Sequence, residues 1–270
     1  SFLFYIISIL YLTFGKIQAL HHYVDFGTHL EILWRNSQGL GLTTLMSEKY
    51  HGGSNWFAAH FTPIIYLTYV PAFAIWSNAY VIPVSETLFI TSSLIPLWLI
   101  SKKYFNSDLS RLFICTFLFY PTIFYTNLYG IAYLELCIPL FLWLFYFFEE
   151  KKNTLFILFL ILCLMVREEV SLVTCFLGIY MMIKKRYLLG VLTIILSLIY
   201  FYTVLFVVMP SFRVEDFNKA HIAAYWYRGW GDTYSEMIAN ILFNPIDALS
   251  KIFTPPKIGN FVMILIPLLF

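Results

Sequence analysis

Only a few residues of this chain could carry out chemistry. Asp25 and His29 are one helical turn apart, which places both side chains on one face of a helix. A carboxylate beside a histidine can act as a general base, as a pair of metal ligands, or as both. Asp25 is therefore a candidate catalytic residue. His29, His60 and Glu135 are candidate substrate-binding residues, and any metal site is left open.

A charged triplet, Arg167, Glu168 and Glu169, stands between two short apolar runs. The runs 154–166 and 171–183 each form about 20 Å of helix, at about 1.5 Å per residue, whereas the hydrocarbon core of a bilayer is about 30 Å thick. The triplet should therefore lie at membrane depth, where charges face a cavity or one another. We assign all three residues to substrate binding, and a structural ion pair is the alternative.

The composition of the chain predicts a membrane protein. Of its 270 residues, 60% are apolar and only 12% are charged, whereas a soluble domain carries about 25% charged residues. This excludes disorder, nucleic-acid binding and a secreted disulfide scaffold. The net charge of +2 is too small to indicate a polyanionic partner. The lipid bilayer is the expected partner, and the oligomeric state is left open.

Long apolar runs predict transmembrane helices, because only helices and closed barrels satisfy the backbone in lipid. We expect an all-α, multipass protein of the cell membrane with about eight spans. The spans are expected near residues 2–19, 80–101, 110–128, 131–148, 154–167, 169–183 and 188–209, with a truncated one from 258. The run 61–76 predicts a juxtamembrane or half-inserted helix. We interpret residues 1–270 as one membrane domain, and as a fragment whose C-terminal part is missing.

Basic residues in three short connections predict the orientation. Lysine and arginine collect in cytoplasmic loops, and such clusters occur at 102–111, 151–152 and 184–186. This orientation leaves loops at about 20–60 and 210–257 on the extracytoplasmic side, which is the expected active face. The second loop adds three candidates for phosphate binding, namely Arg213, Lys219 and Arg228.

The first outer loop contains the pattern of an amphipathic helix. Phe26, Leu30, Leu33 and Trp34 recur at positions i, i+4, i+7 and i+8. This stripe predicts a juxtamembrane helix that lies flat on the membrane surface. Asp25 stands at its start, where a carboxylate can also cap free N–H groups.

Three strings of residues, in order, resemble a family of multipass prokaryotic membrane proteins catalogued as domain of unknown function number 2079. The strings are Val24-Asp25-Phe26-Gly27 with Leu33-Trp34, then His60-Phe61-Thr62-Pro63, then Val166-Arg167-Glu168-Glu169-Val170. That family is in turn similar to the GT-C superfamily of membrane glycosyltransferases, whose first outer loop carries the catalytic acidic residue. The resemblance implies a GT-C-like arrangement of helices, Asp25 as the base, and the Arg167 turn as part of a donor or acceptor site.

The resemblance also implies a function, the transfer of a sugar from a polyprenyl-phosphate donor on the extracytoplasmic side, with or without a divalent metal. Two alternatives stay open. A transporter of a small solute or a lipid-linked substrate would need polar groups that continue to the cytoplasmic leaflet, and the inner halves of the spans contain almost none. A non-catalytic membrane scaffold needs no such path.

Overall fold

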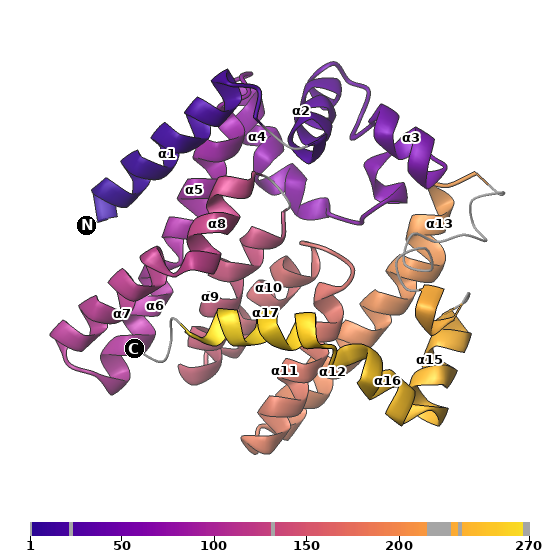
Figure 1. The fold of residues 1–270 in the computed structure, drawn as a ribbon. Coiled ribbons are helices and arrows are strands. Elements are labelled where there is room, and N and C mark those ends of the chain that lie inside the picture. The colour runs from indigo at the N-terminus through magenta and orange to yellow at the C-terminus, as the bar shows by residue number, and fades with distance from the viewer. Residues whose placement is uncertain (1, 22–23, 131–132, 215–227, 232–233, 267–270) are drawn as a thin grey trace. The chain divides into compact units, whose positions relative to one another are not determined.

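The computed structural model describes residues 2–21, 24–130, 133–214, 228–231 and 234–266 (Figure 1). The described residues form helices, turns and loops, with an isolated bridge between Thr43 and Asn55, so the fold is all-α as predicted. The chain divides into two compact units, Ser1–Phe212 and Arg213–Phe270. The interpretation as one membrane domain stays a prediction.

The first unit is built of α-helices joined by short 3₁₀ or π turns, here labelled η. In chain order these elements are α1 (Phe2–Gln18), α2 (Val24–Ser37), α3 (Leu45–His51), η1 (Trp56–Ala58), η2 (Pro63–Leu67), α4 (Tyr69–Ile75), α5 (Val81–Ser92), α6 (Leu94–Tyr104), α7 (Ser107–Phe119), α8 (Pro121–Tyr129), η3 (Leu134–Leu136), α9 (Cys137–Glu149), α10 (Asn153–Leu164), α11 (Val170–Ile183), α12 (Tyr187–Thr203), η4 (Val204–Val208) and α13 (Met209–Ser211). Large aromatic side chains such as Tyr69, Tyr133 and Phe156 are fully buried in its core.

Two described helices are long and apolar enough to cross a membrane. They are Val81–Tyr104, which joins α5 and α6, and Tyr187–Ser211, which begins with α12. The pair α7 and α8 is a third if its bend of 43° is counted within one span. These three coincide with predicted spans. The other predicted spans in the described residues are shorter apolar helices, so the full set of about eight stays a prediction.

The outward side of α12 shows why this helix suits lipid. Leu188, Ile199 and Tyr202 are 77%, 58% and 63% exposed, although the helix is strongly apolar. Large contiguous apolar surfaces are rare on soluble monomers. This side of the helix therefore indicates contact with hydrocarbon chains.

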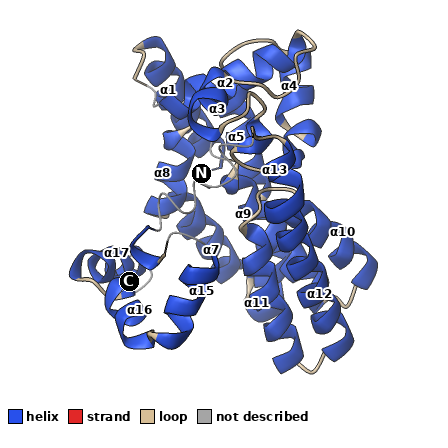
Figure 2. Cartoon of the chain, turned by 90° about the vertical axis from the view of Figure 1, so that its right-hand side faces the viewer, coloured by secondary structure: helices blue, strands red, loops and turns tan. Residues whose placement is uncertain are grey.

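The predicted short hairpin is present as α10 and α11. These helices contain 12 and 14 residues, close to the expected lengths. The charged triplet lies in the turn between them. Helix α11 lies along α12 in both views (Figures 1 and 2). Thr174 and Ser197 join the two helices by a buried hydrogen bond of 2.8 Å between their hydroxyl oxygens.

The amphipathic helix of the first outer loop is present as α2. Of its apolar stripe, Phe26 and Leu33 are buried within the protein, and Leu30 is half-buried. Trp34 is 54% exposed, so it lies outside the face that packs against the protein. The buried face is instead completed by Thr28, His29 and Ile32, because it is rotated toward α4.

The second unit consists of η6 (Arg228–Trp230), α15 (Tyr234–Phe243), α16 (Pro245–Ile252) and α17 (Pro255–Leu265). Helices α15 and α16 fall within the predicted outer loop, and α17 falls on the predicted truncated span. Lys251 in the last turn of α16 pairs with Asp247 over 2.7 Å. Lys219 and His221 lie outside the described residues.

Candidate functional site

The turn between α10 and α11 binds the loop that precedes η2. His60 Nδ1 lies 2.8 Å from Glu168 Oε1, and the backbone N–H of Phe61 donates to Glu168 Oε2 over 2.9 Å. Arg167 Nε donates to Glu169 Oε1 over 2.9 Å. Arg167 Nη2 lies 2.9 Å from His60 Nε2. The ion pair anticipated for the triplet is present, and His60 joins it from 107 residues away.

The hydrogen-bond partners define the proton on the His60 ring. A carboxylate only accepts hydrogen bonds, so His60 donates its Nδ1 proton to Glu168. The lone pair on Nε2 then accepts from Arg167 Nη2. Arg167 Nε also lies 3.1 Å from His60 Nδ1, but its N–H has an acceptor in Glu169. The imidazole is held on both sides and cannot rotate without losing two hydrogen bonds.

Two further hydrogen bonds, one within the loop and one to the end of α10, hold this loop against the hairpin. The indole N–H of Trp56 donates to Thr62 Oγ1 over 3.0 Å. The backbone N–H of Ile64 donates to the carbonyl of Met165, at the end of α10, over 3.1 Å. Together these bonds bring His60 onto the charged turn, and Glu168 itself is only 7% exposed.

His29 is buried beside this cluster. It is 4% exposed, and its ring lies edge-on to the rings of Trp56 and Tyr133, at centroid distances of 5.0 and 4.4 Å. Its Nδ1 has no hydrogen-bond partner among the described residues. Burial, together with the positive charge of Arg167 and the nearby His60 ring, lowers the pKa of His29 to about 3. His29 is therefore an uncharged aromatic wall of the site at neutral pH.

Glu135 is also buried, and it bonds to Tyr69 and to the backbone of Tyr133. Its Oε1 accepts from the hydroxyl of Tyr69 over 3.2 Å and from the backbone N–H of Tyr133 over 3.1 Å. Tyr133 has a φ of 62°, a left-handed conformation that is strained in residues other than glycine. This backbone geometry turns its N–H toward Glu135, and its ring packs against His29.

Asp25 has a different environment. Its side chain is exposed, in the first turn of α2, and its Oδ2 accepts a hydrogen bond from the hydroxyl of Tyr129, at the end of α8, over 3.0 Å. Asp25 and His29 share a helix, but one is exposed and the other is buried. Among the described residues, Tyr129 is the donor to Asp25, and the other oxygen of this exposed carboxylate can face a substrate hydroxyl.

Six of the seven predicted site residues thus come together from four segments of the chain. Trp56 links His29 to His60, and the centroids of the Trp56 and His60 rings are 5.5 Å apart. Tyr133 links His29 to Glu135, through its ring and its backbone N–H respectively. The six are His29, His60, Glu135, Arg167, Glu168 and Glu169. Asp25 makes none of their contacts in the described part of the chain. Trp56, Tyr129 and Tyr133 could not be singled out beforehand, because 20% of the chain is aromatic.

Other charged residues lie outside this cluster of contacts. Glu86 in α5 is fully buried, and neither carboxylate oxygen has a hydrogen-bond partner among the described residues. Arg213 is half-buried at the start of the second unit. Nothing is described of the side chain of Arg228. The phosphate-binding role of these arginines stays a prediction.

The comparison with protein families agrees with the three strings that carry the resemblance. A family described as "Predicted membrane protein (DUF2079)" matches residues 16–270. The chain belongs to this family. No curated protein and no solved structure matches it. The family match therefore supports a membrane protein and assigns no chemistry to this DUF2079 protein.

One set of side chains in the DUF2079 protein has the spacing of metal ligands. His60, Glu168 and Glu169 each offer a ligand atom, and these atoms lie within 4.8 Å of one another. The guanidinium of Arg167 contacts two of the three residues. It already supplies a positive charge at this position, so a metal ion would have to displace it. The geometry favours arginine over a metal as the cation of the site.

The burial of His29 predicts a pH dependence of stability. Its pKa is about 3 in the folded protein and about 6.5 in the unfolded chain, so the unfolded state binds more protons below pH 6.5. Its contribution to stability is complete above that pH and is lost as the pH falls. For wild type, we expect this residue to account for about 2 kcal/mol of lost stability between pH 7 and pH 5.

The measurement is thermal unfolding in detergent at both pH values. His29→Phe keeps an aromatic ring between Trp56 and Tyr133 but cannot be protonated, so it should lose less stability in acid than wild type. His21→Phe, at an exposed histidine, serves as the control and should behave as wild type. Equal losses in wild type and His29→Phe would contradict the assignment.

Proposed function

We propose that this protein is a membrane glycosyltransferase with a GT-C-like arrangement of about eight spans. It transfers a sugar from a polyprenyl-phosphate donor to an acceptor hydroxyl on the extracytoplasmic side of the cell membrane. Asp25 acts as the general base, and the cluster around His60 binds the substrate. The observation that carries the proposal is the exposed Asp25 carboxylate, held by the Tyr129 hydroxyl over 3.0 Å.

A general base needs an accessible oxygen and a fixed orientation. Tyr129 donates to one oxygen of Asp25, which orients the carboxylate and leaves the other oxygen for an acceptor hydroxyl. The location at the start of α2 suits this role, because an amphipathic helix lies at the membrane surface. A lipid-linked donor presents its phosphate and sugar at the same depth.

The charged cluster suits the phosphate and sugar of such a donor. Arg167 is 21% exposed at its side chain, and its planar guanidinium has five N–H groups, more than its bonds to Glu169 and His60 require. His60 is fixed by Glu168, so it presents one orientation to a ligand. The aromatic rings of Trp56 and His29 provide apolar walls beside it. Whether a divalent metal joins the substrate is an outcome of the assay below.

The test is sugar transfer by the purified protein in proteoliposomes. The substrate is a radiolabelled polyprenyl-phosphate hexose, assayed with and without Mg²⁺ or Mn²⁺. Asp25→Asn should lower the rate about 100-fold or more, because a general base contributes about 10²–10⁴-fold. Tyr129→Phe should lower it less, since the carboxylate remains.

Asp108→Asn is the matched control for this experiment. Asp108 is also an exposed carboxylate in the first turn of a helix, α7, where it pairs with Arg111. This variant should retain the wild-type rate. Turnover by Asp25→Asn at the wild-type rate would remove Asp25 as the base. Absence of transfer by the wild-type protein with every hexose donor would overturn the proposal.

A transporter is the second candidate, and Glu86 is the observation that favours it. This residue is fully buried within Val81–Tyr104, a helix long enough to cross the membrane. Both of its oxygens are without a partner among the described residues. Ionisable residues inside a membrane often mark proton or ion pathways. Solute uptake into proteoliposomes driven by a proton gradient, and lost in Glu86→Gln, would favour this function over sugar transfer.

A further inference from the structure

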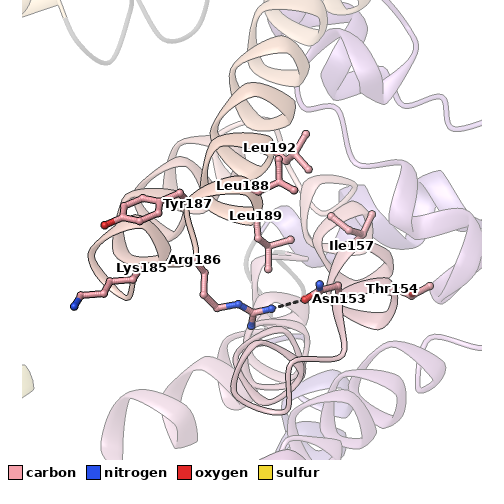
Figure 3. A pocket seen from close by; sticks show the side chains of 9 residues that line it. All are labelled: Asn153, Thr154, Ile157, Lys185, Arg186, Tyr187, Leu188, Leu189 and Leu192. Atoms are coloured by element: carbon pink, nitrogen blue, oxygen red, sulfur yellow. Dashed lines mark hydrogen bonds between the residues drawn. The ribbon is translucent and has the colours of Figure 1, made fainter.

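A groove lies where α10 and α12 begin, away from the site described above. It has a volume of about 610 Å³ and is open to the surface. Its polar end is formed by Asn153, Lys185 and Arg186, and its apolar wall by Ile157, Leu189 and Leu192. Figure 3 shows Arg186 reaching toward Asn153, with Leu189 and Leu192 further along α12. Lys185 extends in the other direction.

The groove lies at a boundary between water and membrane. Tyr187–Ser211, with 25 residues, is the more apolar of the two helices that can cross a membrane, and the basic residues stand immediately before it. Helix α10 begins in the same way, with Lys151 and Lys152 ahead of a strongly apolar segment. Because both helices begin here, the polar end of the groove lies at the level of lipid headgroups and its apolar wall lies beside the acyl chains.

The surroundings of the groove are positively charged. Lys151, Lys152 and Lys184 stand beside Lys185 and Arg186 in the two adjoining turns. Two carboxylates occur in the same region, and both have partners elsewhere. Glu149 accepts from the hydroxyl of Tyr104 over 3.2 Å, and Glu150 pairs with Lys103. Glu149 keeps its negative charge and Glu150 also acts on Lys152, but the five cations of the two turns outnumber these two carboxylates.

Arg186 is held in place before any ligand binds. Its Nη1 donates to the carbonyl of Phe148 over 2.6 Å, its Nη2 donates to Asn153 Oδ1, and its guanidinium lies over the Phe148 ring. Among the described residues these bonds use two of its five N–H groups, which leaves donors for a phosphate. A guanidinium fixed in this way loses little conformational entropy when it binds a phosphate.

We propose that this groove binds the phosphate of an anionic phospholipid. Arg186 holds the phosphate oxygens, Lys185 adds positive charge at the rim, and one acyl chain lies along Leu189 and Leu192. The combination of cations and an adjoining apolar wall fits a lipid better than a free phosphate, because a free phosphate has no apolar part to contact the leucines. Basic pockets between helices at a membrane surface are a known mode of headgroup binding. The proposal does not depend on the proposed transferase activity.

The experiment measures lipid binding to the whole chain in a neutral detergent by native mass spectrometry and thermal unfolding. The probes are short-chain phosphatidylglycerol, phosphatidylcholine of the same chain length, and inorganic phosphate. Phosphatidylglycerol should bind tightest and raise the unfolding temperature. Lys185→Gln should weaken its binding about fivefold, in line with one basic residue near a lipid surface. Arg186→Gln should weaken it about tenfold or more, because a phosphate bound by several hydrogen bonds is lost.

Two further variants separate specific binding from general charge and from misfolding. Lys102→Gln removes a cation from another basic turn, where Lys102 bonds to Ser107, and should leave binding unchanged. Leu192→Trp fills part of the groove beside the apolar wall and leaves Arg186 unchanged. It should weaken phosphatidylglycerol binding, so the proposal can be tested even if Arg186→Gln fails to fold. The proposal would be overturned if the two lipids bound equally or if inorganic phosphate stabilised the protein as much as phosphatidylglycerol. It would also be overturned if Lys102→Gln and Lys185→Gln lost equal affinity, or if Leu192→Trp bound the lipid as wild type does.

Discussion

Replacing Glu168 by alanine is expected to destabilise the protein by about 3–5 kcal/mol, because two donors in a largely buried site lose their acceptor at about 1–3 kcal/mol each. Glu168 accepts from the ring of His60 over 2.8 Å and from the backbone N–H of Phe61 over 2.9 Å. Without it, both donors remain in a buried region with no acceptor. Thermal unfolding in detergent should show a midpoint lowered by about 10 °C or more.

Glu169→Ala provides a matched control at the next residue. Glu169 pairs with Arg167 over 2.9 Å, but its side chain is 44% exposed, and exposed pairs contribute about 0–1 kcal/mol. The loss of stability should therefore be several times smaller than in Glu168→Ala. Similar losses of stability in the two variants would show that Glu168 does not hold the loop with His60 and Phe61 in place, which would contradict the described site.

Replacing Gly178 by alanine is expected to force α11 and α12 apart. A Cβ atom on Gly178 would lie 2.6 Å from Ile194 Cγ1 and 2.8 Å from the carbonyl oxygen of Gly190. Small residues allow membrane helices to approach closely in this way. The carbonyl belongs to the backbone and cannot rotate aside. We therefore expect a loss at the upper end of the about 1–3 kcal/mol typical of overpacking, measured by thermal unfolding in detergent.

Gly15→Ala is the control for a glycine within a helix. A Cβ atom there would meet nothing within 4 Å, and alanine in a helix is favoured over glycine by about 0.5–1 kcal/mol, so this variant should be slightly stabilised. Gly190→Ala should resemble Gly178→Ala, because its Cβ would lie 2.7 Å from the carbonyl oxygen of Gly178. If Gly178→Ala were as stable as Gly15→Ala, the close approach of the two helices would be refuted.

Both predictions concern the same hairpin, and they affect function in different ways. The glycine contact positions α11 against α12, and the Glu168 contact positions His60 above the turn. Loss of either is expected to disturb substrate binding, because a site built from four segments depends on the packing between them. Asp25 is attached to α8 through Tyr129, so its position should be less sensitive to these changes.

Much of the fold follows from the sequence alone, because the lengths of apolar runs and their period are local properties. The apolar composition indicated the membrane. The runs at 154–166 and 171–183 predicted two helices too short to span, with a charged turn between them, and α10 and α11 have this form. The stripe from Phe26 to Leu33 predicted α2. Glu31 and Arg35 on α2 form the ion pair that an i, i+4 spacing favours, at 2.8 Å.

The partners of the charged residues were decided only by the tertiary structure. Arg167 and Glu168 both bind His60, which is more than 100 residues away, and no local pattern specifies that pairing. Asp25 and His29 share a helix face by spacing, yet packing buries His29 against Trp56 and Tyr133 and leaves Asp25 exposed. The sequence by itself determined which residues carry charge within an apolar chain. Tertiary packing decided which of them meet, because burial and donor geometry depend on segments that are distant in the chain.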